Sequence, residues 1–272
     1  MQTKTRANKT ANIIPQPGSE ETFIDRLIDY VSYYDPDWKG SLVPASDEQI
    51  QRYKEFSEIE STGKDIPATH LAYLKRMGQD DGGLLTKLGA GGFYDIDYLI
   101  GFYHADPKLW PNWEDPTHLV IFNSYMGIPL SIALLENDLI IDGDDEENYK
   151  YYAENFEKMV FQHAFHQLGR CEYNISIASS KNSVNEAKEA YQVTNILDHL
   201  TRVVEAEGLA KAWFSDETHF IAISDRINVS VRNTSGAVVG FISGLDREEV
   251  ERKGSLFIEN MGAIMDEKSW EK

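Results

Sequence analysis

The stretch HLVIFNSYMGIPLSIALLENDLIID, residues 118–142, decides the fold class of this chain. It holds three short apolar runs, at 118–123, 128–135 and 138–142, and a glycine-containing turn at 125–127 joins the first two. Short apolar runs joined in this way are typical of antiparallel strands in hairpins. Three strands in direct succession between helical patterns predict an α+β fold, with an antiparallel-rich sheet flanked by helices, rather than a doubly wound α/β sheet.

Helical signals precede and follow these strands. We expect a first helix from Ser19 and a second from Ser46, because serine is a preferred N-cap and Ser46 forms a capping-box pattern with Gln49. A third helix is expected to follow Pro67, since proline is tolerated in the first helical turn. A fourth is expected over residues 153–168 and closes this part of the chain.

The remainder of the chain follows the same order of helix, strands and helix, without residue-level similarity to the first part. Residues 174–182 are polar and serine-rich, which indicates a linker or surface loop. A helix is expected over 183–208, followed by strands at 213–214, 220–223, 227–231 and 238–242 and by a last helix over 246–264. The chain is therefore predicted to have a flexible tail (1–18), an α+β domain (19–169) and a second, smaller α+β unit or extension of unknown role (170–272).

The chain is strongly acidic. Its 26 Lys and Arg residues against 45 Asp and Glu residues give a net charge of −19. A field of this sign repels phosphate backbones, so a nucleic-acid partner is not expected, whereas a basic protein or cations are favoured. Solubility alone is an equally good explanation of the charge.

The sequence also bears on where the protein acts. Cys171 is the one cysteine, so an intrachain disulfide framework is excluded. No run approaches the roughly 18 apolar residues of a membrane span, and the N-terminal residues lack the apolar stretch of a secretory signal. We therefore expect a cytoplasmic protein without a membrane partner.

Motifs of catalysis and cofactor binding are missing. The chain has no nucleophile elbow, and its glycine-rich stretch 89–92 fits neither phosphate-binding pattern. His163 and His166 lie near Cys171, but a closed zinc site needs four ligands. We predict a non-enzymatic protein with no metal and no cofactor. A hydrolase with an unrecognised site stays open as an alternative, because catalytic triads are defined by geometry rather than by spacing.

Acidic residues are the first candidates for partner binding. The densest group follows the third predicted strand and contains Asp142, Asp144, Asp145, Glu146 and Glu147. It is not an EF-hand loop, because a loop beginning at Asp142 would need glycine at position 147. Asp80 and Asp81 add two acids in the loop after the third helix. These carboxylates would pair with a basic partner, or they form solvated loops.

Two tryptophans are the other candidates. Trp110 and Trp113 lie in an aromatic stretch beside acidic residues. Exposed tryptophans are frequent interface hot spots and can contact cations through their rings. The alternative is core packing beneath a loop.

The order of these signals resembles the SUKH superfamily over residues 20–168. Its members carry an acidic helix, an aliphatic–proline pair that opens a second helix, a glycine loop, strands with a polar turn, an aspartate-rich strand end and a closing helix. The segments that carry the resemblance here are 50–59, 66–67, 71–74, 78–83, 118–123, 125–127, 139–145 and 156–157. The long aromatic stretch 84–117 departs from the pattern, and residues 171–272 are not covered by it.

The resemblance implies a function as well as a fold. Bacterial members of the superfamily are immunity proteins that neutralise toxins, often nucleases, by binding them inside the cell. By this resemblance the chain is expected to bind a cognate, basic polymorphic toxin through its acidic face. A eukaryotic branch is similar to regulators of cell-wall synthesis and signalling, so a regulatory scaffold or adaptor is the alternative.

Overall fold

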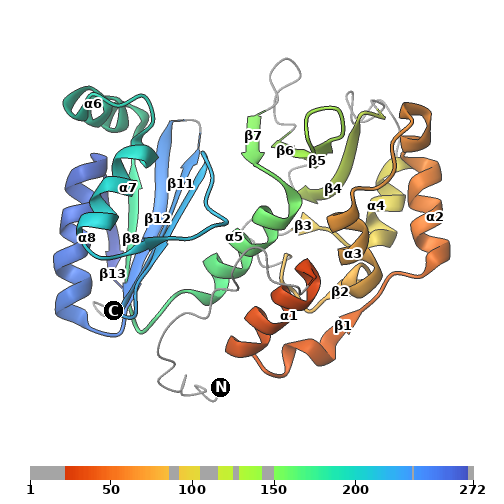
Figure 1. The fold of residues 1–272 in the computed structure, drawn as a ribbon, viewed down its shortest axis with the longest axis horizontal. Coiled ribbons are helices and arrows are strands. Elements are labelled where there is room, and N and C mark those ends of the chain that lie inside the picture. Colours follow the sequence, from red (N-terminus) through yellow and green to blue (C-terminus); the bar gives the residue numbers. More distant parts are fainter. Residues whose placement is uncertain are drawn as a thin grey trace. The chain divides into compact units, whose positions relative to one another are not determined.

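The computed structural model describes residues 22–85, 92–104, 116–124, 129–142, 150–234 and 236–268. The chain divides into two compact units, of which the first ends at Leu168 and the second begins at Gly169. Each unit combines helices with an antiparallel sheet (Figure 1). The predicted α+β fold class is therefore confirmed.

The first unit contains a five-stranded meander. Each strand pairs antiparallel with the next one in the chain. In spatial order the strands are β3 (Gly92–Phe93), β4 (His118–Ser124), β5 (Pro129–Ala133), β6 (Leu139–Asp142) and β7 (Lys150–Ala153). The three strands predicted within 118–142 are confirmed, whereas β3 and β7 were not predicted.

Helices surround this sheet. They are α1 (Phe23–Tyr34), α2 (Asp47–Phe56), α3 (Ala68–Met77), α4 (Ile96–Tyr103) and α5 (Phe156–Leu168), with short 3₁₀ turns η1 (Trp38–Ser41) and η2 (Ile59–Thr62). The predicted capping box of α2 is present, since Gln49 N donates to Ser46 Oγ and Ser46 N donates to Gln49 Oε1. The predicted start of the first helix at Ser19 is wrong, because Thr22 supplies the cap by accepting from Asp25 N at 3.2 Å.

Aromatic side chains hold these helices together. Phe156, the first residue of α5, packs edge-on against Phe23 of α1 and Tyr73 of α3, with ring centroids 6.3 Å and 5.3 Å away. Arg26 of α1 forms a partly buried ion pair with Glu157 of α5. A two-stranded sheet, β1 (Leu42–Val43) with β2 (Asp80–Asp81), completes the unit.

The second unit contains a six-stranded antiparallel sheet. Its spatial order is β13 (Ile264–Lys268), β8 (Tyr173–Ser179), β12 (Ala237–Gly244), β11 (Ile227–Thr234), β10 (His219–Ile223) and β9 (Ala210–Lys211). The linker predicted at 174–182 is wrong, because most of it is β8, which lies between β12 and β13. Ile175 and Ile177 are buried and alternate with polar residues, which is the period of a strand.

Three helices lie on one face of this sheet (Figure 1), namely α6 (Lys181–Tyr191), α7 (Ile196–Ala206) and α8 (Arg247–Met261). The single helix predicted over 183–208 is wrong, since Gln192 adopts a left-handed conformation and Asn195 caps a second helix. Residues 213–214, predicted as a strand, form a turn. The core between helices and sheet includes Leu200 and Phe257, both fully buried.

Gly240 tests the pairing of β11 with β12. A Cβ at this position would lie 2.0 Å from the carbonyl oxygen of Ser230, a backbone atom that cannot move aside. Gly240→Ala is therefore expected to lower the free energy of unfolding by roughly 2–3 kcal/mol. Gly101→Ala in α4 is the control: no atom lies within 4 Å of its Cβ, and alanine should raise stability by about 0.5–1 kcal/mol. Urea denaturation measures both changes, and an unaltered midpoint for Gly240→Ala would contradict this register.

Candidate functional site

The fold separates the two acids Asp80 and Asp81, which were predicted to share one binding face. Both lie in β2, where successive side chains point to opposite sides of the strand. Asp80 is exposed, whereas Asp81 is 0% exposed. Asp81 is therefore wrongly assigned to a partner-binding surface, because a partner cannot reach its carboxylate.

The carboxylate of Asp81 accepts four hydrogen bonds inside the first unit. Oδ2 accepts from the Tyr73 hydroxyl and from Leu85 N, each at 2.8 Å. Oδ1 accepts from Gly83 N at 2.8 Å and from Leu84 N at 2.9 Å. Burial raises the pKa of the Asp81 carboxyl, while these hydrogen bonds act in the opposite direction. The group holds the turn after β2 rather than a ligand.

The backbone of the same segment is fixed too. Trp38 Nε1 donates to the carbonyl oxygen of Asp81 at 2.9 Å, and Asp81 N donates to the Tyr94 hydroxyl at 3.2 Å. Gly82 has φ +65°, and a Cβ there would lie 2.6 Å from Trp38 Nε1. Only glycine fits this position. Because the backbone next to Asp80 is held in this way, Asp80 is held at the surface.

Asp80 belongs to what we call the acidic edge, four exposed carboxylates of the first unit: Asp47, Glu48, Asp80 and Asp97. Gln49 of α2 connects the segments that carry them. Its Nε2 donates to Asp97 Oδ1 in α4 at 2.8 Å and to Gln79 Oε1, beside β2, at 2.5 Å. Three of the acids lie in the first turn of α2 or α4, where the helix dipole favours negative charge.

The net charge of the chain is concentrated in this unit. Residues 17–168 hold 28 acidic and 11 basic residues, a charge of −17, whereas residues 169–272 hold 17 and 12, a charge of −5. The total over the whole chain did not reveal this difference. The first unit therefore presents a much stronger negative field than the second.

The structure does not describe the side chains of the other predicted contact residues. Asp142 is the last residue of β6, and its side chain is outside the described residues. The remaining candidates also lie outside them: Trp110, Trp113, Asp144, Asp145, Glu146 and Glu147. Their part in partner binding stays a prediction.

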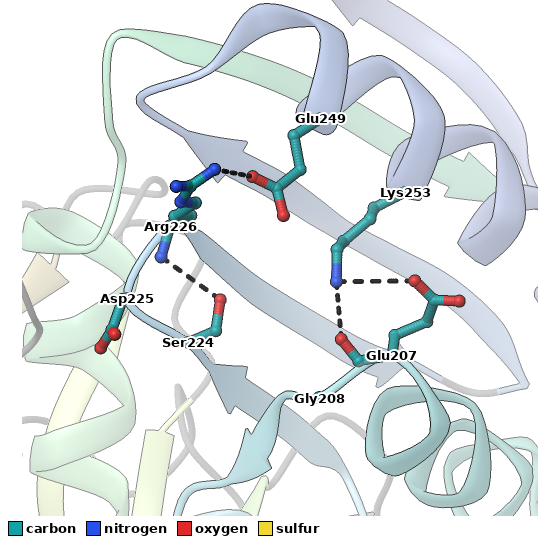
Figure 2. Close-up of a pocket in the computed structure, with 7 residues that line it drawn as sticks. All are labelled: Glu207, Gly208, Ser224, Asp225, Arg226, Glu249 and Lys253. Atoms are coloured by element: carbon teal, nitrogen blue, oxygen red, sulfur yellow. Dashed lines mark hydrogen bonds and ion pairs between the residues drawn. The ribbon is translucent and has the colours of Figure 1, made fainter.

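The second unit has an open recess of about 350 Å³ (Figure 2). Three segments line it: the end of α7, the turn between β10 and β11, and the first half of α8. The lining residues are Glu207, Gly208, Ser224, Asp225, Arg226, Glu249 and Lys253. Sequence reasoning missed this site, since these segments are far apart in the chain and carry no motif.

Lys253 joins α8 to the end of α7. Its side chain is buried, its Nζ donates to the carbonyl oxygen of Glu207 at 2.7 Å, and the Glu207 carboxylate lies 3.5 Å away. Arg252 pairs with the same carboxylate at 3.0 Å, and its hydrogen bond is the main cause that lowers the pKa of Glu207. A cation at the C-terminal end of a helix is favourable, so Lys253 acts as a structural cap.

The recess is suited to charge pairing. Ser224 Oγ accepts from the backbone nitrogens of Arg226 and Ile227, at 3.3 Å and 3.0 Å, and so shapes the turn. The seven lining residues include neither histidine nor cysteine. The Ser224 hydroxyl donates to the carbonyl oxygen of Ile227 at 3.4 Å. The arrangement offers carboxylates and cations to a charged ligand.

His163 is one of the histidines that were considered as zinc ligands. His163 Nε2 lies 3.1 Å from the Tyr152 hydroxyl. In the described part of the chain, no group of three His, Cys, Asp or Glu side chains is placed to hold a metal ion. No helix in that part is long and apolar enough to cross a membrane.

Comparison of the chain with models of protein families, with curated proteins and with solved structures found no match. The resemblance to the SUKH superfamily therefore stays a prediction from the order of sequence signals.

Replacing Asp81 tests its internal role. Asp81→Asn puts an amide NH₂ where the carboxylate now accepts from backbone nitrogens, so we expect a loss of roughly 3 kcal/mol in the free energy of unfolding. Asp80→Asn is the matched control and should change stability by less than about 0.5 kcal/mol, because its side chain is exposed. Urea denaturation of both variants measures the difference, and equal effects would contradict the buried placement of Asp81.

His70 predicts a pH dependence of stability. It is buried against Tyr53, Tyr73 and Phe156, and neither ring nitrogen has a hydrogen-bond partner in the described residues. Burial lowers the pKa of His70 from 6.5 to about 3. The unfolded chain therefore binds a proton at His70 more readily than the folded chain does. As far as His70 is concerned, the folded protein has its full stability above pH 6.5 and loses stability as the pH falls from 6.5 toward 3.

Urea denaturation at pH 7.5 and pH 4.5 measures this effect. Between these values the native protein should lose roughly 2–3 kcal/mol more stability than His70→Phe, which keeps an aromatic ring without the titration. An equal loss in both proteins would show that His70 is not held neutral by burial.

Proposed function

We propose that this chain is a non-enzymatic cytoplasmic binding protein, an immunity protein of SUKH type that neutralises a cognate basic toxin by direct binding. The observation that carries the proposal is the charge of −17 in the first unit, against −5 in the second. A basic protein surface is the partner that such a field attracts most strongly. The order of sequence signals in the same unit supports the same conclusion.

The acidic edge would guide the encounter. Exposed carboxylates complementary to a basic surface increase the association rate and disfavour partners of the wrong charge. Asp80 is fixed by the buried turn beside it, so this carboxylate is preorganised for contact. Blocking would be steric, and the tryptophans and acids predicted at 110–113 and 142–147 would extend the contact.

A regulatory adaptor is the second candidate. The favouring observation is that the second unit has a hydrophobic core of its own and a much smaller net charge. Two units of such different charge suit two different partners. An adaptor would form a ternary complex on the full chain, whereas an inhibitor needs only the toxin.

Reversing charge on each unit tests the proposal. The edge variant carries Asp47→Lys, Glu48→Lys, Asp80→Lys and Asp97→Lys. The control variant carries four exposed acids of the second unit changed in the same way, Glu186→Lys, Glu189→Lys, Glu205→Lys and Glu217→Lys. Calorimetry against the cognate basic toxin should show about 100-fold weaker binding for the edge variant.

The control variant changes the net charge by the same amount, so its affinity should fall by less than about threefold. Circular dichroism verifies that both variants are folded. Equal losses would mean that total charge, and not the acidic edge, governs binding. An edge variant with native affinity would refute the electrostatic mechanism.

A further inference from the structure

The recess of the second unit contains a carboxylate with unfilled hydrogen-bonding capacity. Glu249 Oε2 is shielded from solvent and accepts no hydrogen bond from the described residues. Arg226 pairs with this carboxylate (Figure 2). The pair is loose, because Arg226 Nη1 lies 3.8 Å away and the Arg226 side chain is 72% exposed. A shielded acceptor without a donor is unfavourable, and a ligand donor that displaced the exposed Arg226 side chain would remove that penalty.

Glu249 occupies a position in α8 from which its side chain could bond to the backbone of the N-cap residue. Asp246 caps α8 and accepts from Glu249 N at 3.1 Å, so Glu249 is the residue that would complete a capping box. In α2 the equivalent Gln49 does complete one, by accepting from Ser46 N. The carboxylate of Glu249 makes no such bond and faces the recess instead (Figure 2).

The other charges of the recess are already paired. Lys253 and Arg252 both bind Glu207, so this carboxylate is compensated within the unit. Asp225, which is exposed, also lines the recess and adds a negative charge, and its side chain points away from Glu249 (Figure 2). Among the lining residues, Arg226 is the only cation left to balance the charges of Glu249 and Asp225, and it is loosely held. The recess therefore favours a cationic hydrogen-bond donor.

We propose that this recess binds the guanidinium of an arginine side chain presented by a protein partner. A guanidinium offers a planar fork of donors that matches a carboxylate in two parallel hydrogen bonds. Small-molecule sites are mostly enclosed and apolar, whereas this recess is open and polar. A partner protein would cover it and supply the missing burial. This site is independent of the acidic edge, which belongs to the other unit.

Titration of the full chain with a blocked Gly-Arg-Gly peptide tests the proposal by NMR. The expected result is millimolar binding, with shifts centred on residues 207–208, 224–226 and 249–253. The same peptide with citrulline, a neutral analogue of arginine, should bind at least about fivefold more weakly. Equal binding of the two peptides would overturn the proposal. Free L-arginine that binds tenfold tighter than the peptide would also overturn it, in favour of a small-molecule ligand.

Two pairs of variants distinguish binding at the recess from a general effect of net charge. Glu249→Gln should weaken binding about fivefold, whereas Glu248→Gln, an exposed neighbour outside the recess, should not. Arg226→Ala should strengthen binding because it removes an internal competitor. Arg247→Ala removes the same charge from α8 outside the recess and should have no effect.

Effects that follow charge alone, equal within each pair, would overturn the proposal. Arg226 is largely exposed, so its variant keeps the test decisive even if Glu249→Gln disturbs the fold.

Discussion

The first unit depends on one buried carboxylate. Asp81 lies at the point where β2 ends, and its four hydrogen bonds join the following turn to α3 through Tyr73. Trp38 and Tyr94 hold the backbone on either side. A buried carboxylate is stable only when its acceptor capacity is filled, so the helices, the turn and the aromatic side chains around Asp81 must all adopt this arrangement together.

The burial of Asp81 also explains why the acidic edge has a defined structure. One acid of the Asp80–Asp81 pair is turned inward and satisfied, and the other is thereby fixed outward beside the first turns of α2 and α4. Helix N-termini tolerate the negative charge collected there. The acidic edge follows from the same local structure that fills the core, and it supplies the carboxylates that the proposed binding function requires.

Features set by neighbouring residues could be predicted from the sequence, and features set by distant ones could not. The strands of 118–142 and the capping box of Ser46 and Gln49 were predicted, because each depends on residues a few positions apart. Strand β8 was missed, since its polar residues are explained only by pairing with β12 and β13, far along the chain. The burial of Asp81 depends on Trp38 and Tyr94, and the recess brings together three separate segments.

In the proposed mechanism, the concentrated charge of the first unit binds a basic partner. The most direct measurement is the affinity and association rate of the full chain for the proposed basic toxin, between about 50 and 500 mM salt. We expect at least a tenfold loss of affinity across that range, about as large as the loss in association rate, because screening weakens the field that guides the encounter. An affinity that does not change with salt would refute this electrostatic mechanism.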